Sequence, residues 1–308
     1  MGKGLKSLVG LRRLKTMAAR DIVACRKTRE VFPHTLLIGP GGLGKTSFAE
    51  AIAHDLGYHF EMVEGAMFKC RRSIIGKLVS SSLVAEAHQK RLLFFIDEVH
   101  RLAKEPQEGI YYPLLKFFIP ETKTTLAPFS VFGATTHPHE LLRPFKRRFK
   151  NEWAFSRYDV ADIEVIVAIQ LNKFGLTVSA DVIKMVAVRA LGIPARAYNL
   201  SEKIRNEVLF RGGNRVVSAE DCENTFRLEG IDAIGLDLDQ VSYLQVLSDS
   251  NGTPKGVGGI AGALDRDVDV VEDSIEPVLL SLKFIDRTAR GRVLTEHGYL
   301  HLAKTGKL

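Results

Sequence analysis

The sequence has few cysteines and no long apolar run. Its three cysteines, Cys25, Cys70 and Cys222, lie far apart, and no pair has the spacing of a zinc site. An odd number of scattered thiols is a poor disulfide framework, so we expect reduced cysteines and a cytoplasmic location. No apolar stretch approaches the roughly 20 residues of a membrane helix, and the N-terminus lacks the apolar core of a signal peptide. These absences argue against a membrane protein and a disulfide scaffold.

Histidine is present but unclustered, and charge is unevenly distributed. The nine histidines form no HExxH motif, so we expect no histidine metal site. Residues 1–32 contain nine Lys or Arg and two Asp or Glu, which equals the net charge of +7 for the whole chain. Residues 230–308 contain eight Lys or Arg and twelve Asp or Glu, which gives this segment a net charge of −4. A basic segment indicates either phosphate contact or a solvated face, and the sequence leaves this open for residues 1–32.

The first half of the sequence alternates apolar runs of strand length with helical patterns. The runs 36–38 and 92–96 and the stretch "FSVFGATT" each end in a polar motif. Continuous apolar runs separated by helices predict a parallel sheet that is covered on both faces. In such sheets ligands bind at the carboxyl ends of the strands, where these motifs lie.

The second half predicts helices and then a hairpin. After Trp153 four segments begin near capping residues, and most end at glycine, which indicates a small all-helical domain. The C-terminal stretch continues with short helices and two β-like runs around a Gly-containing turn, typical of a winged helix. We therefore predict an α/β domain at 1–156, a helical lid at 157–229 and a winged helix at 230–308.

The strongest motif is a phosphate-binding loop. "GPGGLGKT" fits GxxxxGK[ST] between a predicted strand and a predicted helix. Glycine-rich backbone and the helix N-terminus direct N–H groups at phosphate oxygens, Lys45 can reach the β- and γ-phosphates, and Thr46 can bind Mg²⁺. The predicted nucleotide-binding residues are Gly39, Pro40, Gly41, Gly42, Leu43, Gly44, Lys45, Thr46 and Ser47.

Three further motifs complete a nucleotide hydrolysis site. Asp97 and Glu98 follow the second strand, so Asp97 suits Mg²⁺ and Glu98 suits deprotonation of the attacking water. Thr135 and Thr136 end the third strand, where a hydroxyl can contact the γ-phosphate or simply cap the strand. "KRRF" places Arg148 in a basic turn, which is either solvated or completes the site of a neighbouring subunit.

The motifs together resemble the RuvB family of AAA+ motors, which drive branch migration of Holliday junctions. The resemblance extends over almost the whole chain and rests on "GPGGLGKTSFAEAIAHDLG", "LLFFIDEVHRL", "FGATTHP", "RRF" and the C-terminal "EP" and "RTARGR" strings. It implies a P-loop domain, a lid and a winged helix in that order. It also implies ATP and Mg²⁺ as cofactors, a hexameric homo-oligomeric ring around duplex DNA, and loading onto a four-way junction by a RuvA partner.

The resemblance assigns roles to matching positions. Thr136 matches the first sensor, Arg148 the finger that acts on the adjacent subunit, and Tyr158 a tyrosine beside the nucleotide. The C-terminal string gives the DNA-contacting residues of the wing, Arg287 and Arg292; Arg290 between them is the one of the three that best fits a solvated turn.

Three features depart from the family pattern. The second sensor arginine corresponds to Arg196, one residue late after Gly192, and one residue turns a helical side chain by about 100°. The hairpin that docks RuvA is reduced to "FIPETKTTLAPF", so the need for a RuvA-like partner stays open. The segment that lies over the adenine is shortened, and only Val9 and Gly10 match its start.

Two other functions stay in competition with a branch-migration motor. One is an AAA+ switch on DNA, such as a replication initiator or a clamp-loader-like protein, for which ATP binding is the functional event. The other is a DNA-binding module without catalysis, against which the intact Lys45, Asp97, Glu98 and Arg148 argue.

Overall fold

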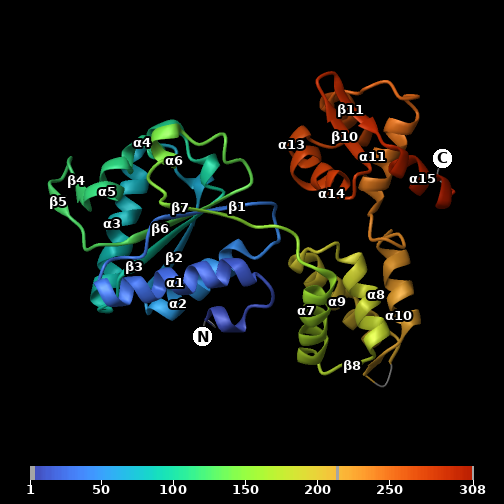
Figure 1. Cartoon of the computed structure of the whole chain (residues 1–308), viewed down its shortest axis with the longest axis horizontal. Coiled ribbons are helices and arrows are strands. Elements are labelled where there is room, and N and C mark those ends of the chain that lie inside the picture. The colour runs from blue at the N-terminus through green and yellow to red at the C-terminus, as the bar shows by residue number, and fades with distance from the viewer. Residues whose placement is uncertain (1–3, 213–214, 307–308) are drawn as a thin grey trace. The chain divides into compact units, whose positions relative to one another are not determined.

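A five-stranded parallel sheet forms the centre of the first half of the chain (Figure 1). The structure is a computed structural model that describes residues 4–212 and 215–306, and its contacts divide the chain into units 1–156 and 157–308. The strand order is β2-β3-β6-β1-β7. The strands are β1 (Thr35–Ile38), β2 (His59–Glu64), β3 (Leu92–Asp97), β6 (Ser130–Thr135) and β7 (Asn151–Ala154).

The three apolar runs form adjacent inner strands, as the sequence predicts. β1, β6 and β3 are buried along nearly their whole length because helices cover both faces of the sheet. On one face Leu36, Phe94 and Val131 pack with residues of the helix 71–87. On the other, Phe48 packs edge-on against Trp153 and belongs to α2 (Lys45–Leu56), a helix that lies below the sheet in Figure 1.

The apolar runs of the sequence predict neither β2 nor β7. β2 and β7 are the two edge strands, and each is only partly buried. β2 reads "HFEMVE", so apolar and polar residues mix, and β7 has four residues with Trp153 as its one buried member. Such short or half-exposed edge strands lack the continuous apolar run that marks an inner strand.

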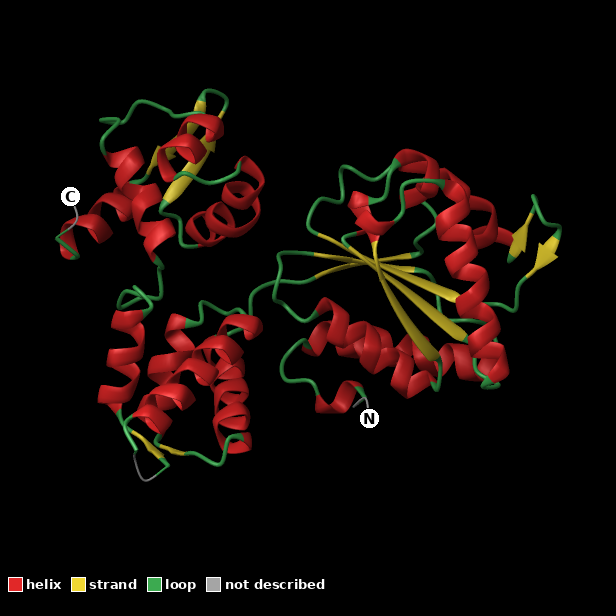
Figure 2. Ribbon diagram, turned by 180° about the vertical axis from the view of Figure 1, so that it is seen from behind, coloured by secondary structure: helices red, strands yellow, loops and turns green. Residues whose placement is uncertain are grey.

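Helices and a small hairpin complete the first unit. Figure 2 shows the hairpin β4–β5 standing away from the five-stranded sheet. The remaining elements are the 3-10 turns η1 (Leu5–Ser7), η2 (Gly65–Met67) and η3 (Val99–Arg101), the helices α1 (Arg12–Thr28), α2 (Lys45–Leu56), α3 (Arg71–Ala87), α4 (Lys104–Gly109), α5 (Tyr111–Lys116) and α6 (Arg143–Lys146), and the strands β4 (Phe118–Ile119) and β5 (Thr124–Thr125). Over the described residues, no helix combines the length and apolarity that crossing a membrane requires.

The second unit begins with four helices, close to the predicted positions. They are α7 (Val160–Lys173), α8 (Ala180–Arg189), α9 (Pro194–Phe210) and α10 (Ala219–Leu228). Ser218 caps α10 in a reciprocal capping box with Asp221, as the sequence signature "SAED" indicates. The segment is not purely helical, because β8 (Thr177–Val178) and β9 (Val216–Val217) form a parallel pair that two-residue runs do not reveal.

The C-terminal part has the helices and hairpin of a winged helix. The predicted hairpin is confirmed, with β10 antiparallel to β11 and Arg287 directly opposite Arg292. Its elements are α11 (Leu238–Ser248), α12 (Val257–Leu264), α13 (Val268–Val270), the π-helical turn η4 (Val271–Ile275), α14 (Glu276–Ser281), β10 (Ile285–Thr288), β11 (Gly291–Leu294) and α15 (Glu296–Lys304). A single apolar cluster that includes Tyr243, Leu279 and Ile285 joins them.

Candidate active site and wing

The phosphate loop connects β1 directly to α2. Gly39 has φ +148°, and a Cβ there would lie 2.6 Å from the carbonyl oxygen of Phe155, so only glycine fits. Gly44 caps α2 in the left-handed region. The loop thus ends at the first turn of a twelve-residue helix, whose free N–H groups and dipole favour an anion.

Lys45 is held inside this loop. Its Nζ donates hydrogen bonds to the carbonyl oxygens of Gly39 (2.7 Å) and Pro40 (2.9 Å), and the residue is 6% exposed. Burial lowers the pKa of Lys45, while the nearby carboxylates of Glu98 and Asp97 act in the opposite direction. A lysine ammonium surrounded by loop backbone and close to two carboxylates fits phosphate oxygens and a cation together.

The acidic pair follows β3, two strands away from β1, and like the phosphate loop it lies at the carboxyl ends of the strands. β3 ends at Asp97, whose Oδ1 accepts a hydrogen bond from the backbone N–H of Glu98 (3.0 Å). Glu98 has φ +43°, a left-handed conformation that non-glycine residues rarely adopt. The sharp turn after Asp97 therefore redirects the chain immediately beyond the strand and into η3.

Thr136 lies between the loop and the acidic pair. β6 separates β1 from β3, and the N–H of Gly39 donates to the carbonyl oxygen of Thr135 (3.1 Å). The Thr136 hydroxyl lies 3.5 Å from Glu98 Oε2, while the fully buried Thr135 hydroxyl lies 3.0 Å from His100 Nδ1. The structure brings Lys45, Asp97, Glu98 and Thr136 to one edge of the sheet, and it favours Thr136 over Thr135 as the residue beside the acidic pair.

Arg148 lies at the opposite edge of the sheet. It follows α6 and precedes Lys150, whose backbone N–H donates to the carbonyl oxygen of His34 (2.9 Å), immediately before β1 begins. The phosphate loop leaves the other end of this four-residue strand, which spans roughly 13 Å. Arg148 is therefore separated from the phosphate loop of its own chain by about the length of strand β1.

The Arg148 guanidinium is incompletely satisfied. Its Nε is buried and has no hydrogen-bond partner among the residues that the structure describes. It borders a cavity of about 620 Å³ whose lining includes Pro33, His34, Phe117, Arg147, Arg148 and Lys150. A buried guanidinium nitrogen without a partner is uncommon in a folded protein and costs stability.

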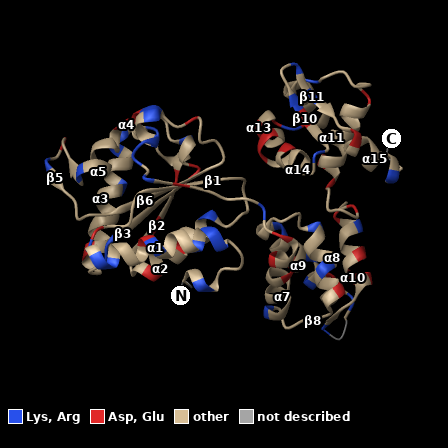
Figure 3. Cartoon of the chain, in the orientation of Figure 1, with Lys and Arg blue, Asp and Glu red and all other residues tan. Residues whose placement is uncertain are grey.

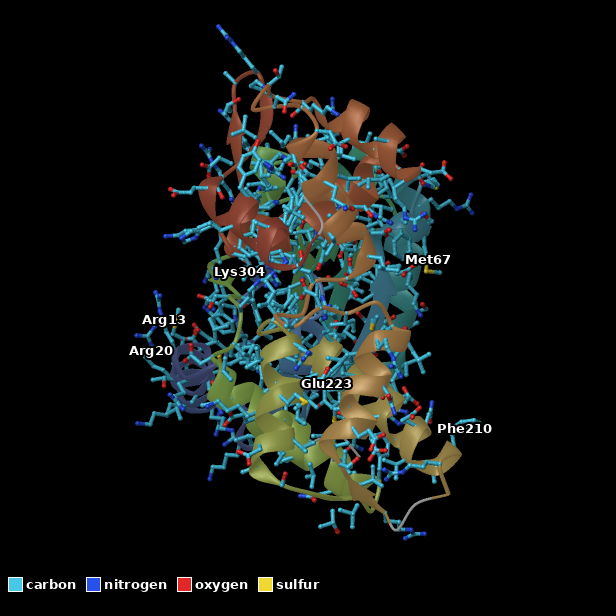
Figure 4. All side chains as sticks on the ribbon, turned by 90° about the vertical axis from the view of Figure 1, so that its right-hand side faces the viewer. Arg13, Arg20, Met67, Phe210, Glu223 and Lys304 are labelled. Atoms are coloured by element: carbon cyan, nitrogen blue, oxygen red, sulfur yellow. The ribbon has the colours of Figure 1, made fainter. Side chains whose placement is uncertain are left out.

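The N-terminal segment lies against the helix of the phosphate loop. The N–H of Leu5 donates to Asp55 Oδ2 (3.0 Å) near the end of α2, and Val9 follows between η1 and α1. This places Val9 in the same unit as the loop. The basic residues of α1 are largely solvent-facing, and Figure 4 shows Arg13 and Arg20 projecting away from the helix.

The two predicted nucleotide contacts of the second unit are tied to their own surroundings. The N–H of Tyr158 donates to the carbonyl oxygen of Gly192 (2.9 Å), and burial raises the pKa of its hydroxyl. Arg196 is the third residue of α9, and its guanidinium donates to the carbonyl oxygen of Gly235 and lies 3.9 Å from Asp237. Burial lowers the pKa of Arg196, against the charge of Asp237. The guanidinium of the candidate second sensor is therefore already engaged within the second unit.

The arginines of the wing differ in their surroundings. Glu276 is fully buried, and its carboxylate accepts hydrogen bonds from the Tyr243 hydroxyl (2.8 Å), Arg287 Nε (2.9 Å) and Arg292 Nε (2.8 Å). Arg292 also donates to Glu272 Oε1 (2.7 Å). Burial alone would raise the pKa of Glu276, yet the hydrogen bonds from Arg292, Tyr243 and Arg287 hold it below its ordinary value.

This carboxylate makes the facing arginine pair possible. Arg287 and Arg292 are cross-strand neighbours, and like charges directly opposite each other destabilise a hairpin. The shared Glu276, together with Glu272 on Arg292, offsets their charges; the Arg287 side chain is 48% exposed and that of Arg292 only 15% exposed. Arg290 lies at the exposed turn, where Figure 3 shows basic residues at the hairpin. Of the three, Arg287 and Arg290 are the ones with substantial exposure.

Comparisons with known proteins agree with this architecture. A family model described as "Holliday junction DNA helicase RuvB P-loop domain" matches residues 2–154, and one described as "RuvB C-terminal winged helix domain" matches residues 233–303. The Holliday junction branch migration complex subunit RuvB of Synechococcus sp. (strain RCC307) is 33% identical over 309 residues, which cover 97% of this chain and 88% of that protein. The corresponding subunit of Prochlorococcus marinus (strain MIT 9313) is 32% identical over 97% of this chain and 86% of its own length.

The chain belongs to the RuvB family. A solved structure, the Thermotoga maritima RuvB Holliday junction branch migration motor, superposes on it with a TM-score of 0.88 and 28% identity, covering 98% of this chain and 97% of that chain. The predicted fold class, a P-loop sheet domain with a lid and a C-terminal winged helix, is thereby confirmed. Membership of the RuvB family also makes this chain a P-loop ATPase.

Two residues of this RuvB-family site were missed by sequence reasoning. Glu276 sits in an "EP" string that marks the family, but its burial beneath the two arginines is visible only in three dimensions. His100 lies two residues after Glu98 in "DEVHRL", and the absence of a metal motif left it among the unassigned histidines. Nearness to Glu98 in the chain was the one sequence signal for His100, and no spacing in the sequence places Glu276 beneath the two arginines.

Proposed function

We propose that this chain is an ATP-dependent DNA motor that drives branch migration of Holliday junctions. The observation that carries the proposal is the gathering of Lys45, Asp97, Glu98 and Thr136 at one edge of the sheet, with Arg148 at the other. This arrangement provides a complete hydrolysis site only when another chain supplies the arginine. The relatives named above are branch migration subunits, and they align along almost the whole length of this chain.

The roles of the residues follow from their chemistry. The loop from Gly39 to Thr46 binds the phosphates, and Lys45 exchanges its carbonyl partners for phosphate oxygens. Thr46 and Asp97 supply the oxygen ligands that suit Mg²⁺, which would neutralise phosphate charge. Glu98 accepts the proton of the attacking water, and the Thr136 hydroxyl holds this water beside the γ-phosphate. The family resemblance assigns Val9 and Tyr158 to positions beside the nucleotide and Arg196 to the second sensor.

The position of Arg148 argues for a closed oligomer. A head-to-tail contact, in which one edge of the sheet meets the other edge of the next chain, generates a ring when the rotation closes. We propose a homo-oligomeric ring, hexameric as in the family, that encircles duplex DNA, with wing arginines on the phosphate backbone. The three domains of this motor are residues 1–156, 157–229 and 230–308.

A RuvA-like partner is part of the proposal in a restricted form. The hairpin that would dock it consists of two-residue strands, β4 and β5. A short hairpin offers little area, so we expect a weaker dependence on the partner than a full-length hairpin would give.

Junction movement tests the proposal directly. Wild-type protein and Glu98→Gln are incubated with a four-way junction, Mg²⁺ and ATP, and product duplexes are separated by gel electrophoresis. We expect movement by wild type only, with junction binding retained in both. Wild-type protein that binds the junction but never moves it under any ATP condition, with or without a RuvA-like partner, would identify an ATP switch instead.

A further inference from the structure

His100 contacts the proposed catalytic base directly. It belongs to the turn η3, in which the N–H of Arg101 donates to the carbonyl oxygen of Glu98 (2.8 Å). The turn brings the imidazole of His100 next to the carboxylate of Glu98, and His100 Nδ1 lies 3.2 Å from Glu98 Oε2. The His100 side chain is 7% exposed, whereas that of Glu98 is 33% exposed. The buried imidazole of His100 therefore lies against one oxygen of the more accessible Glu98 carboxylate.

The same nitrogen is tied to the end of β6. His100 Nδ1 also lies 3.0 Å from the hydroxyl of the buried Thr135. Thr135 accepts a second hydrogen bond from the backbone N–H of His137 (2.9 Å), and the His137 ring packs edge-on against His100 with centroids 5.0 Å apart. The imidazole thus bridges the turn after β3 and the loop after β6.

The backbone allows this close approach. Gly133 lies in β6 opposite the turn, and a Cβ there would come within 3.0 Å of Val99 Cγ1 and 3.2 Å of Leu36 Cδ1. Both contacts are tighter than an ordinary van der Waals contact, so a larger residue would push η3 away from the sheet. Glycine in "VFGATT" therefore serves the placement of His100 as well as the strand.

The geometry also selects the form of the ring. A carboxylate oxygen cannot donate, so the 3.2 Å approach of Glu98 Oε2 favours the tautomer with a proton on Nδ1, and the hydrogen bond at this nitrogen is the one with the Thr135 hydroxyl. Burial lowers the pKa of His100, against the opposing charges of Glu98 and Glu140, which favours a neutral ring. A neutral Nδ1–H donor orients the carboxylate without neutralising its charge, as a base requires.

We propose that His100 is a positioning residue that fixes Oε2 of Glu98 and thereby leaves Oε1 as the oxygen that accepts the proton of the attacking water. Glu98 Oε2 accepts a hydrogen bond from Thr136 and lies 3.2 Å from His100 Nδ1, whereas Oε1 has no hydrogen-bond partner among the residues that the structure describes. Because Thr135 and Thr136 are consecutive, movement at the end of β6 changes both contacts at once. His100 therefore ties the geometry of the base to the strand that carries the sensor.

The test separates positioning from folding by comparing two substitutions at one site. His100→Ala removes the donor, and His100→Asn keeps an N–H close to the position of Nδ1. In steady-state ATP hydrolysis with junction DNA, we expect kcat of His100→Ala to fall roughly tenfold, which is less than the 10²–10⁴-fold that a positioned base supplies, because the base is still present but no longer oriented. KM for ATP should stay within about twofold, because the loop and Lys45 are untouched. His100→Asn should recover most of the rate.

A double-mutant cycle shows whether His100 acts through Glu98. In a Glu98→Gln background the added His100→Ala should cost nothing further in the residual single-turnover rate, since the base is already absent. A full additional loss in that background would overturn the inference. His88→Ala, which removes an exposed histidine from the end of α3, is the matched control and should leave the rate unchanged.

A substitution at a second residue gives an independent test. Thr135→Val keeps the volume of a fully buried residue and removes the hydroxyl that His100 contacts, so kcat should fall with KM unchanged even if His100→Ala fails to fold. Unchanged kcat in Thr135→Val and in the folded His100 variants overturns the inference. The inference rests on the proposed hydrolysis roles: a wild-type protein that does not hydrolyse ATP refutes those roles, whereas normal turnover without His100 refutes only this one.

Discussion

At the scale of single residues, Glu276 is the most consequential side chain outside the nucleotide site. It is fully buried, and its charge is balanced by Arg287 and Arg292. Removing one partner of a buried ion pair leaves the other charge unsatisfied and costs about 3–5 kcal/mol. The same balance that stabilises the hairpin therefore makes it dependent on the ionisation of one carboxyl group.

This dependence predicts acid sensitivity of the winged helix. The folded-state pKa of Glu276 lies below the ordinary value of 4.5, so its stabilising contribution is fully present above pH 4.5 and is lost as pH falls through the lower folded value. Urea unfolding followed by hairpin-specific hydrogen exchange at stepwise pH should show this decline. Glu276→Gln should be less stable at neutral pH and should lack this part of the pH dependence. An identical pH profile in both proteins would contradict the prediction.

Sequence reasoning identified the residues with motifs and missed those that position them. Lys45, Asp97 and Thr136 stand in strings whose spacing alone indicates their chemistry. His100 and Glu276 have no such spacing, because their roles depend on which side chain lies above them after folding. For Arg196 the sequence revealed a shift of one residue, but only the structure shows its guanidinium on Gly235 and Asp237.

At the scale of elements, the arginines of the hairpin β10–β11 differ in their exposure and in their ion pairs. Arg287 is half exposed, while Arg292 is held by both Glu272 and Glu276. We expect Arg287→Ala to weaken DNA binding and to lower the slope of log affinity against log salt by about 0.9, with a smaller loss of thermal stability than Arg292→Ala causes, because buried Glu276 keeps Arg292 as a partner. Arg292→Ala should weaken binding and also lower the melting temperature. Fluorescence anisotropy with a labelled junction at several salt concentrations, alongside calorimetry, measures both effects.

Arg290→Ala provides the comparison within the same hairpin. Its side chain lies at the exposed turn, so a change in the salt slope without a change in stability would assign it to the DNA contact. A slope equal to that of wild type would assign it to solvent. If Arg287→Ala leaves the slope unchanged, the wing is not the phosphate contact.

Elements were predictable where burial is continuous. β1, β3 and β6 are inner strands, and their apolar runs predicted them with nearly correct ends. β2 and β7 are edges, and β8 and β9 have two residues each, too short for any periodicity. The hairpin β10–β11 was found because Gly291, at φ +139°, marks its turn.

At the scale of the whole molecule, the separation of Arg148 from its own phosphate loop predicts complementation between chains. Arg148→Ala should retain ATP binding and hydrolyse slowly, and Glu98→Gln should bind without hydrolysis. In an equal mixture, roughly a quarter of the sites of a randomly assembled ring combine an intact Glu98 with an intact neighbouring arginine. The mixture should therefore regain about that share of wild-type ATPase activity.

The control for complementation is the double variant. A chain that carries both substitutions, mixed with either single variant, places an intact Glu98 beside an intact Arg148 nowhere and should restore nothing. Absence of rescue in the mixture of single variants, under conditions where both assemble, would mean that Arg148 acts within its own chain or not at all.

The order of the parts was visible in the sequence, and the assembly was not. Composition and motif order predicted a sheet unit, a helical segment and a winged helix, and the contacts place a boundary after residue 156. How many chains assemble depends on the angle at which two surfaces meet, which no motif in a single chain encodes.

The distance between Arg148 and its own loop has a consequence for the newly made protein. On the proposed role of Arg148, a chain without neighbours binds a nucleotide but lacks the arginine that accelerates its hydrolysis. Free chains would therefore keep ATP bound and hydrolyse it slowly, and hydrolysis would become fast only after assembly. Specific activity should then rise with protein concentration, so that the cell needs no separate inhibitor to keep unassembled chains from draining ATP.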